Sequence, residues 1–446
     1  MRLTIIPGDK YIAIDNNGLL DIQQDLNWIP SNVHALQWYD TWGEVEYNDE
    51  TPNERIENLG IFEQAVADFN NEKKILQDEL DAIEAAEQLV RLKRMASPSA
   101  WVDRDQIVGR LRLAVDRVMG EGGVWDEDLA AVAIRQAEGD LIEAVHLLRS
   151  FRSTLPRFAY GTDVDADELR VIRRIVPAFR NPPGPQLLGR TSDYTSRLLE
   201  LTDESLAREE AEKLQTQLWA DQLDEDAPST ASQEHQQPRR LLETLRDMNL
   251  MVDRRRTDDP DPFDITRSPA RPPAPRSARL SSMARAETGA LVNQWYRNIL
   301  GPDGYLHEVT LGEVRHGYLP VRVSHPITGN PVHVGDVRVT EVEAIEDLNG
   351  IDEDRDRFDV GYGLCFGHNE KKAIAMANLD IACHRDGGQT QVEQSLLLTT
   401  DGLDSSGFLE HLKLPHYVTF RSMMERKMAV RNAKQKPAAD DKGTSK

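Results

Sequence analysis

A long helix near the N-terminus constrains the fold of this chain more than any other sequence feature. Residues Asn58–Met95 contain no proline and place apolar residues at helical spacing among many charged ones, which predicts one extended amphipathic helix. The apolar positions are Ile75, Leu76, Leu80, Ile83, Leu89 and Leu92. A charged helix of this kind usually packs on a partner helix or forms a coiled coil. Ser97-Pro98-Ser99 ends it, so we expect a boundary between separately folded parts here.

The residues before this helix predict a small β-meander. Leu3–Ile6 and Tyr11–Ile14 are short apolar stretches typical of strands. An aromatic cluster follows, which consists of Trp38, Trp42 and Tyr47. We therefore expect residues 1–95 to form an N-terminal extension made of a meander and a long charged helix.

Residues 100–202 predict a helical region. Gln106–Met119 carries apolar residues at helical spacing, and the glycines within Gly120–Gly123 are expected to stop that helix. Asp126 is a suitable cap for the next helix, and a further helix is expected over Leu141–Leu155.

Residues 203–260 read as an acidic and polar insertion. Glu204–Asp226 favours a helix, and the polar run over residues 226–238 predicts disorder. The chain closes with a basic stretch, residues 431–446, which we also expect to be disordered.

Residues 261–430 predict a mixed α+β region. Ser281–Tyr296 favours a helix, and Val309–Val323 and Val332–Ile345 alternate like antiparallel strands around a turn. A further strand around residues 361–367 leads into a helix over Glu370–Cys383. The fold class is therefore α+β: a meander and long helix, then a helical half, then a half of antiparallel sheet and helices.

Composition limits the class of protein. The formal net charge is −23, and Asp40–Glu87 holds fifteen acidic residues against three basic ones, which argues against non-specific nucleic-acid binding. Cys365 and Cys383 are the only cysteines, so a disulfide scaffold and a four-cysteine metal site within one chain are excluded. No apolar run could span a bilayer and no secretory signal is evident. We expect a cytoplasmic protein.

Two histidines near the end of the chain are the main candidates for metal binding. They lie in His411-Leu-Lys-Leu-Pro-His416-Tyr417, a spacing that on an unbroken helix would set the side chains about 140° apart. Pro415 disfavours an unbroken helix, and a bend there could bring both rings to one point, where neutral imidazole could bind zinc. His368 could supply a third ligand. The residues alone also allow two ordinary histidines at a helix end.

Other segments could bind anions or sugars. Gly361-x-Gly363-x-x-x-Gly367 precedes a predicted helix, where backbone N–H groups could face a phosphate or where close packing could require glycine. The loop of residues 184–194 could contact a sugar or phosphate, or be an ordered connector. A proline-rich segment carries arginines that could bind a polyphosphate or form a solvated loop, namely Arg267, Arg271, Arg276 and Arg279.

Blocks of residues in order along the chain carry a family resemblance. They are Leu113–Met119 with Glu121–Gly123, Gln186–Gly189 with Asp193–Thr195, Asp264–Pro269, Gly312–Arg315 with Gly317-Tyr318, Gly335 with Thr340-Glu341, Gly361–Leu364 with Phe366-Gly367, and His411–Tyr417. In these blocks, from about Gln106 to Met424, the chain resembles PhnI, the I subunit of the bacterial carbon–phosphorus lyase core complex. The closing block is the most specific of them.

The resemblance implies a reaction and partners. Together with G, H and L subunits the family displaces adenine from ATP with an alkylphosphonate, which gives a ribose 1-phosphonate 5-triphosphate. An iron–sulfur cluster belongs to the J subunit, and none is expected in this chain. In the family the two closing histidines hold zinc at the border with the J subunit, here His411 and His416. G-, H-, J- and L-type partners and a homodimer within the complex are implied, with no membrane or nucleic acid.

The matching blocks also suggest residues for the chemistry. Displacement at the ribose anomeric carbon develops positive charge, so carboxylates near the ring would help. The catalytic candidates are Glu121, Asp193 and Glu341, and the substrate-binding candidates are Gln186, Thr191, Arg267 and Arg279.

The chain also departs from the family pattern. Its N-terminal segment is not recognisable, and Trp38–Tyr47 instead resembles bacteriophage tail-associated sequences. Pro185 stands where a second glycine is usual, and Ser196 where a histidine is expected. These departures leave two alternatives open: a non-catalytic assembly or scaffold protein with a lyase-like fold, and a nucleosidase that releases the base from ATP or GTP.

Overall fold

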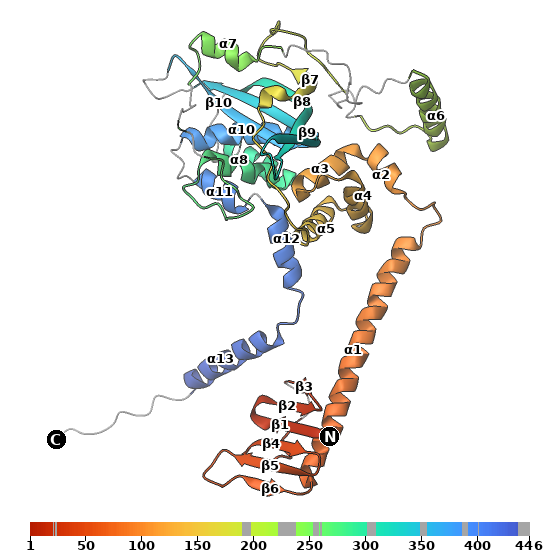
Figure 1. Ribbon diagram of the computed structural model, residues 1–446, viewed down its shortest axis with the longest axis vertical. Coiled ribbons are helices and arrows are strands. Elements are labelled where there is room, and N and C mark those ends of the chain that lie inside the picture. Colours follow the sequence, from red (N-terminus) through yellow and green to blue (C-terminus); the bar gives the residue numbers. More distant parts are fainter. Residues whose placement is uncertain are drawn as a thin grey trace, which may run out of the picture. The chain divides into compact units, whose positions relative to one another are not determined.

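The computed structural model describes residues 1–20, 22, 25–189, 198–221, 238–252, 258, 261–300, 309–347, 355–385, 391–399 and 401–435. The chain forms two compact units, Met1–Trp101 and Val102–Lys446 (Figure 1). No helix among the described residues is both long and apolar enough to cross a membrane. Both units contain helices and antiparallel sheet, which confirms the predicted α+β class.

The first unit is built on a six-stranded antiparallel sheet in the order β3-β2-β1-β4-β5-β6. Its strands are β1 (Arg2–Ile6), β2 (Tyr11–Ile14), β3 (Asn17–Leu19), β4 (Val33–Tyr39), β5 (Trp42–Tyr47) and β6 (Glu54–Ile56). Asp15 and Asn16 join β2 to β3 with positive φ angles of 47° and 73°, the backbone that a two-residue hairpin loop requires. Trp38 is buried in the core below the sheet. The predicted strands and meander are confirmed.

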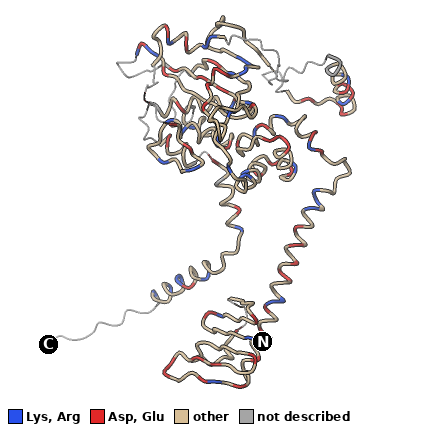
Figure 2. Tube along the Cα trace, viewed as in Figure 1, with Lys and Arg blue, Asp and Glu red and all other residues tan. Residues whose placement is uncertain are grey.

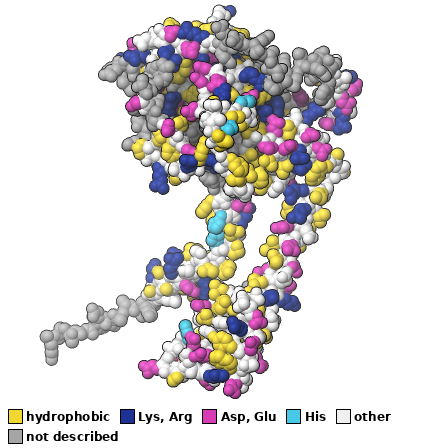
Figure 3. All heavy atoms as spheres, viewed as in Figure 1, with side chains coloured by type: hydrophobic (Ala, Val, Ile, Leu, Met, Phe, Trp, Pro, Cys, Tyr) yellow, Lys and Arg dark blue, Asp and Glu magenta, His cyan; other side chains and the backbone are white. Residues whose placement is uncertain are grey.

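One long helix, α1 (Gln64–Met95), follows a 3₁₀ turn at Gly60–Glu63. Its first turns pack Ala65 and Phe69 into the core of the sheet, whereas apolar residues from Leu76 onward are exposed. Apolar side chains lie along α1 among charged ones of both signs (Figures 2 and 3). At about 100° per residue, Leu76 shares the face of Phe69 while Leu92 points to the opposite side. The predicted single apolar stripe is therefore divided between two faces.

The second unit begins with a small helical bundle. Its helices are α2 (Arg104–Arg110), α3 (Arg112–Gly122), α4 (Glu127–Gln136) and α5 (Leu141–Ser153). The side chain of Asp126 accepts from Leu129 N at 2.9 Å, as expected of a cap. Two details differ from the sequence prediction. The helix predicted over Gln106–Met119 is interrupted at Leu111, which separates α2 from α3. Helix α3 continues through Gly120 and Gly122 and is capped by Gly123, whose φ is +69°. Gly120 lies within that helix, and close packing explains the glycine, because a Cβ there would be 2.7 Å from the carbonyl oxygen of Phe366.

A four-stranded antiparallel sheet in the order β10-β9-β8-β7 forms the centre of the second unit. Its strands are β7 (Arg170–Ile175), β8 (Val309–Ser324), β9 (Pro331–Asp347) and β10 (Phe358–Phe366). Helix α10 (Glu370–Arg385) covers one face. Gly361 and Gly363 face α10 so closely that a Cβ would lie 1.9 Å and 2.2 Å from its backbone oxygens. Close packing thus explains this part of the glycine run.

The remaining helices are α6 (Glu204–Asp221), α7 (Leu241–Asp247), α8 (Arg276–Arg285), α9 (Thr288–Trp295), α11 (Gln391–Thr399), α12 (Gly402–His411) and α13 (Tyr417–Gln435), with 3₁₀ and π turns at Ala166–Glu168 and Tyr296–Leu300. The helix predicted over Ser281–Tyr296 is two helices, because Glu287 caps the start of α9 by accepting from Gly289 N and Ala290 N. Residues 431–435, predicted to be disordered, continue α13. Nearly all of the predicted disordered run 226–238 lies outside the described residues.

Candidate functional site

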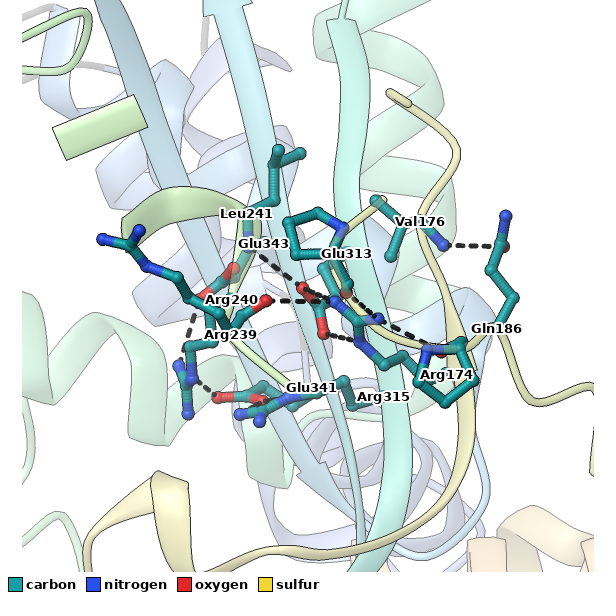
Figure 4. A network of polar contacts seen from close by, with 12 residues as sticks. Arg174, Val176, Gln186, Arg239, Arg240, Leu241, Glu313, Arg315, Glu341 and Glu343 are labelled. Atoms are coloured by element: carbon teal, nitrogen blue, oxygen red, sulfur yellow. Dashed lines mark hydrogen bonds and ion pairs between the residues drawn. The ribbon is translucent and has the colours of Figure 1, made fainter. Parts of the chain in front are cut away.

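A buried network of charged side chains lies on the face of the β7–β10 sheet opposite α10 (Figure 4). Strand alternation builds it, because residues paired across neighbouring strands point to the same face. On β9, Glu341 pairs with Arg315 of β8 and Leu364 of β10, while the alternate residue Val342 is buried in the core under α10. With Arg174 of β7 and Tyr362 of β10, the network joins all four strands on one side of the sheet.

Arg174 and Glu313 form the most deeply buried pair of this network. Their side chains are 0% and 1% exposed, and Arg174 Nε donates to Glu313 Oε1 at 2.7 Å. Arg174 Nη1 also donates to the carbonyl oxygens of Pro183 at 2.8 Å and Pro185 at 3.1 Å. The loop before Gln186 is thus held by a buried cation. Pro185, a departure from the family pattern, contributes its carbonyl group here, so the missing N–H costs the loop nothing in this contact.

Glu341, a predicted catalytic carboxylate, uses both of its oxygens within the network. Arg315 Nε donates to Oε2 at 2.6 Å, and the hydroxyl of Tyr362 donates to Oε1 at 2.9 Å. Arg240 Nη1 lies 3.4 Å from Oε1. Both oxygens of Glu341 are therefore already held by neighbouring side chains. The geometry therefore suits a positioning role that holds Tyr362 and the arginines in place.

Glu343 is a candidate that the sequence blocks did not reveal. Arg240 Nη1 donates to its Oε1 at 3.0 Å, whereas Oε2 has no hydrogen-bond partner among the described residues. Burial raises the pKa of Glu343 to about 7, the charge of Glu341 adds to that rise, and Arg240 opposes it. A carboxyl group with a pKa near neutrality can both donate and accept a proton. The only sequence signal was its alternation with Glu341 on a predicted strand.

Glu121, the second predicted carboxylate, lies in a separate network between the helical bundle and α9. It is 1% exposed, and its Oε1 accepts from Arg117 Nε at 2.9 Å and from Thr288 N at 3.0 Å. Asn369 bridges toward the sheet, since its Nδ2 donates to Thr288 Oγ1 at 2.8 Å and its N–H to Thr340 Oγ1 at 3.1 Å. This second network thus reaches Thr340 on the α10 side of the sheet and does not include Glu341. Asp193, the third candidate, lies outside the described residues.

Two further histidines stack on the α10 side of the sheet. The rings of His316 and His368 have centroids 4.1 Å apart, and His316 Nδ1 lies 3.2 Å from Thr340 Oγ1. Burial lowers the pKa of His316 to about 3, with a further contribution from His368. Burial also lowers the pKa of His368. Both rings are therefore neutral at physiological pH.

The two closing histidines lie on either side of a bend, with their rings near one another. Helix α12 ends at His411, α13 begins at Tyr417, and Pro415 lies in the bend between them. The ring centroids of His411 and His416 are 5.4 Å apart and nearly perpendicular. His416 Nδ1 is 2.5 Å from the carbonyl oxygen of Leu414. Because a carbonyl only accepts, Nδ1 is the donor in this contact, and in the neutral ring Nε2 is then the nitrogen with the lone pair that a metal ligand needs.

The pair alone does not make a complete metal site. The part of the chain that the structure describes contains no group of three or more histidine, cysteine or acidic side chains placed to hold a metal. His368 therefore does not join the pair as a third ligand. Both side chains of the pair are exposed, so further ligands could approach from outside the chain.

The predicted substrate-binding residues do not gather in one place. Gln186 Oε1 accepts from Val176 N at 3.1 Å and so fixes its own loop to the end of β7. Arg267 is 60% exposed and lies over the ring of Tyr160 at 4.3 Å. Arg279 is buried and donates to Glu393 Oε1 at 3.1 Å and to a backbone carbonyl at 2.7 Å. These contacts describe structural roles for Gln186 and Arg279. Thr191 lies outside the described residues.

Comparison with known proteins identifies relatives over most of the chain. The family model of the bacterial phosphonate metabolism protein PhnI matches residues 76–436. That match begins within α1, earlier than the resemblance seen from about Gln106, while the six-stranded sheet precedes it. A protein described as a candidate C-P lyase subunit, HtxH of Stutzerimonas stutzeri, is 42% identical over 353 residues, 77% of this chain and 92% of the relative.

Two further relatives carry the name alpha-D-ribose 1-methylphosphonate 5-triphosphate synthase subunit PhnI. The protein of Rhizobium meliloti is 38% identical over 328 residues, which is 72% of this chain and 84% of the relative. The protein of Escherichia coli is 37% identical over 351 residues, which is 77% of this chain and 94% of the relative.

Proposed function

The chain belongs to the PhnI family of bacterial phosphonate metabolism proteins, and from this premise we propose that it is a subunit of a carbon–phosphorus lyase complex. In that complex it takes part in displacing adenine from ATP with an alkylphosphonate. The product is a ribose 1-phosphonate 5-triphosphate, and G-, H-, J- and L-type subunits are the partners. The names of the relatives support the role as a subunit of the complex. The reaction itself is our proposal.

The observation that carries the proposal is the convergence of His411 and His416. The most specific family block folds into a bend that sets the two rings 5.4 Å apart, with the His416 tautomer fixed for Nε2 ligation. The donor set fits zinc, which accepts imidazole nitrogens. Bound there, zinc supplies Lewis acidity toward a phosphonate or phosphate oxygen. Two ligands leave positions for a J-type partner, water or substrate.

The carboxyl groups of the sheet suit the charge that the reaction develops. Displacement at the ribose anomeric carbon has oxocarbenium character, which a nearby carboxylate stabilises. Adenine leaves more readily when it is protonated, and a group with a pKa near the working pH transfers protons best. Glu343, with its pKa near 7, is the described group that best meets this second need.

Reconstitution with partners tests the proposal. The purified chain is combined with G-, H- and L-type subunits, ATP and methylphosphonate, and free adenine and a phosphonate-bearing ribose triphosphate are measured by chromatography and ³¹P NMR. We expect both products in equal amounts. Adenine without the phosphonate product would support a nucleosidase, and neither product would contradict the proposed reaction.

A second candidate, an assembly protein, is favoured by one observation. The six-stranded sheet lies outside the family match, and α1 exposes apolar residues such as Leu80 and Ile83, which are 48% and 58% exposed. Such residues mark a surface for another protein. Incubating the chain alone with ATP or GTP distinguishes the alternatives, since a scaffold releases no free base whereas a nucleosidase does.

A further inference from the structure

A pocket of about 510 Å³ lies beside the buried network. Tyr362, Leu364 and Phe366 of β10 form one of its walls. Tyr362 and Leu364 pair with Glu343 and Glu341 on β9, so the wall continues the face of the sheet that carries the network. The volume falls within the range of about 300–1,000 Å³ typical of sites for small organic ligands.

The helix that lines the pocket also contributes apolar residues. Leu280 and Ala284 of α8 line it from one face of that helix, four residues apart. Phe366 remains 46% exposed although it is a large aromatic residue. The aromatic and aliphatic residues of β10 and the aliphatic residues of α8 give the pocket an apolar lining that suits a flat, weakly polar ring.

The lining of the same pocket includes positively charged residues. Arg152 and Arg285 both line it. Gly123, with φ of +69°, leaves room for the first of these, since a Cβ there would lie 3.1 Å from Arg152 Nη1. Among the described residues no carboxylate pairs with Arg152. A guanidinium without a carboxylate partner is available to bind phosphate oxygens through paired hydrogen bonds.

The remaining side of the pocket is a fixed loop from the family block Asp264–Pro269. Asp264 Oδ1 accepts from Thr266 N at 2.9 Å and from Thr266 Oγ1 at 2.5 Å. Arg157 Nη1 lies 3.5 Å from Asp264 Oδ2 and Arg157 Nη2 donates to Thr266 Oγ1 at 2.7 Å. The loop is thus formed before any ligand binds, which lowers the entropy cost of binding.

We propose that this pocket binds the nucleoside triphosphate of the reaction, with the base and ribose between β10 and α8 and the phosphates against Arg152 and Arg285. The inference rests on the proposed function for the identity of the ligand. An apolar pocket with cations in its lining matches a molecule with a flat ring at one end and anionic groups at the other. A short alkylphosphonate has too little apolar surface to use these walls.

The pocket also connects the nucleotide to the candidate carboxylates. The ring of Tyr362 lines the pocket and its hydroxyl donates to Glu341 at 2.9 Å. A ribose held against this wall would lie on the face of the sheet that carries Glu341 and Glu343. These carboxyl groups would then be close to the atoms that change charge.

Filling the pocket is the first test. Ala284→Trp places a large ring in the pocket, and Val332→Trp, at the exposed end of the β8–β9 hairpin where Val332 is 40% exposed, is the matched control. Binding of ATP and of adenosine to the full chain is measured by calorimetry. We expect Ala284→Trp to weaken both by at least about tenfold and the control to change neither. If Ala284→Trp does not fold, Phe366→Ala, which removes part of the apolar lining, replaces it.

Removing the cation is the second test. Arg152→Gln removes the charge and keeps a polar side chain, and Arg110→Gln, at an exposed arginine of α2, is its control. Arg152→Gln should weaken the binding of ATP and of tripolyphosphate by about ten- to a hundredfold. The affinity for adenosine should not change. Equal losses for ATP and adenosine would contradict the assignment of the phosphates to this part of the pocket.

The outcomes separate the inference from the function on which it rests. Unchanged ATP affinity in folded Ala284→Trp or Phe366→Ala, or no ATP binding by the wild-type chain, overturns the pocket assignment even if the reconstituted complex makes product. Pocket-dependent ATP binding in a complex that makes no phosphonate product supports the pocket and contradicts the proposed reaction.

Discussion

Glu341 and Glu343 lie two residues apart on β9 and share one face of the sheet, but their surroundings differ. Glu341 has donors on both oxygens, from Arg315 and Tyr362, whereas one oxygen of Glu343 has no partner among the described residues. A sequence block could indicate Glu341 as a candidate. It could not indicate Glu343, because the side chain that pairs with it, Arg240, lies 103 residues away in the chain.

The stability of the protein should depend on pH through Glu343. Its pKa is about 7 in the folded chain against an ordinary 4.5. Between these values the folded chain holds a proton that the unfolded chain lacks, so the free energy of unfolding falls as pH rises through this window. In the wild type the free energy of unfolding should fall by roughly 2 kcal/mol between pH 5 and pH 8, and Glu343→Gln should abolish this fall. Urea denaturation at both pH values measures the free energy of unfolding. The same change with pH in variant and wild type would refute the prediction.

Breaking the buried ion pair of Glu341 and Arg315 should lower the stability of the fold much more than breaking an ion pair on the surface. Glu341→Ala leaves the buried Arg315 without its carboxylate, which should destabilise the fold by about 3–5 kcal/mol. Glu168, paired with Arg322 at side-chain exposures of 38% and 31%, is the control, and Glu168→Ala should destabilise the fold far less because solvent screens the pair. Equal losses in chemical denaturation would show that burial does not govern these pairs.

At the scale of elements, local patterns predicted which segments are helices and strands, and packing decided where they end. The strands of the meander, the β8–β9 hairpin and α10 lie where the sequence predicts them. The ends of α3 and α8 differ: Gly120 lies inside α3, where contact with β10 leaves no room for a side chain, and Glu287 caps a new helix. Such contacts join residues far apart in the chain, which a local pattern does not contain.

The glycines of β10 should be essential to its packing on α10. In Gly361→Ala the new Cβ would meet the carbonyl oxygen of Ala377 at 1.9 Å, so the strand and helix must separate, at a cost of about 3 kcal/mol or more. Gly109, within α2, has nothing within 4 Å of such a Cβ. Gly109→Ala should therefore stabilise the chain by about 0.5–1 kcal/mol. Thermal unfolding of both variants tests the contrast, and a tolerated Gly361→Ala would contradict it.

At the scale of the whole molecule, the chain joins a family region to an unmatched sheet. The PhnI match spans residues 76–436, so the family region begins within α1 and the six-stranded sheet precedes it. The bend that unites His411 and His416 could be predicted, because proline and spacing are local signals. The pocket and the Glu343 network could not, since their parts come from segments far apart in the chain.

Zinc content of the assembled complex tests the central claim most directly. His411→Ala and His416→Ala are compared with His325→Ala, which removes a half-buried histidine from the β8–β9 turn. Metal is measured by mass spectrometry after reconstitution with the J-type partner. The account predicts that either variant of the pair loses zinc, while the control and the wild type retain it. Full zinc occupancy in both His411→Ala and His416→Ala would contradict it.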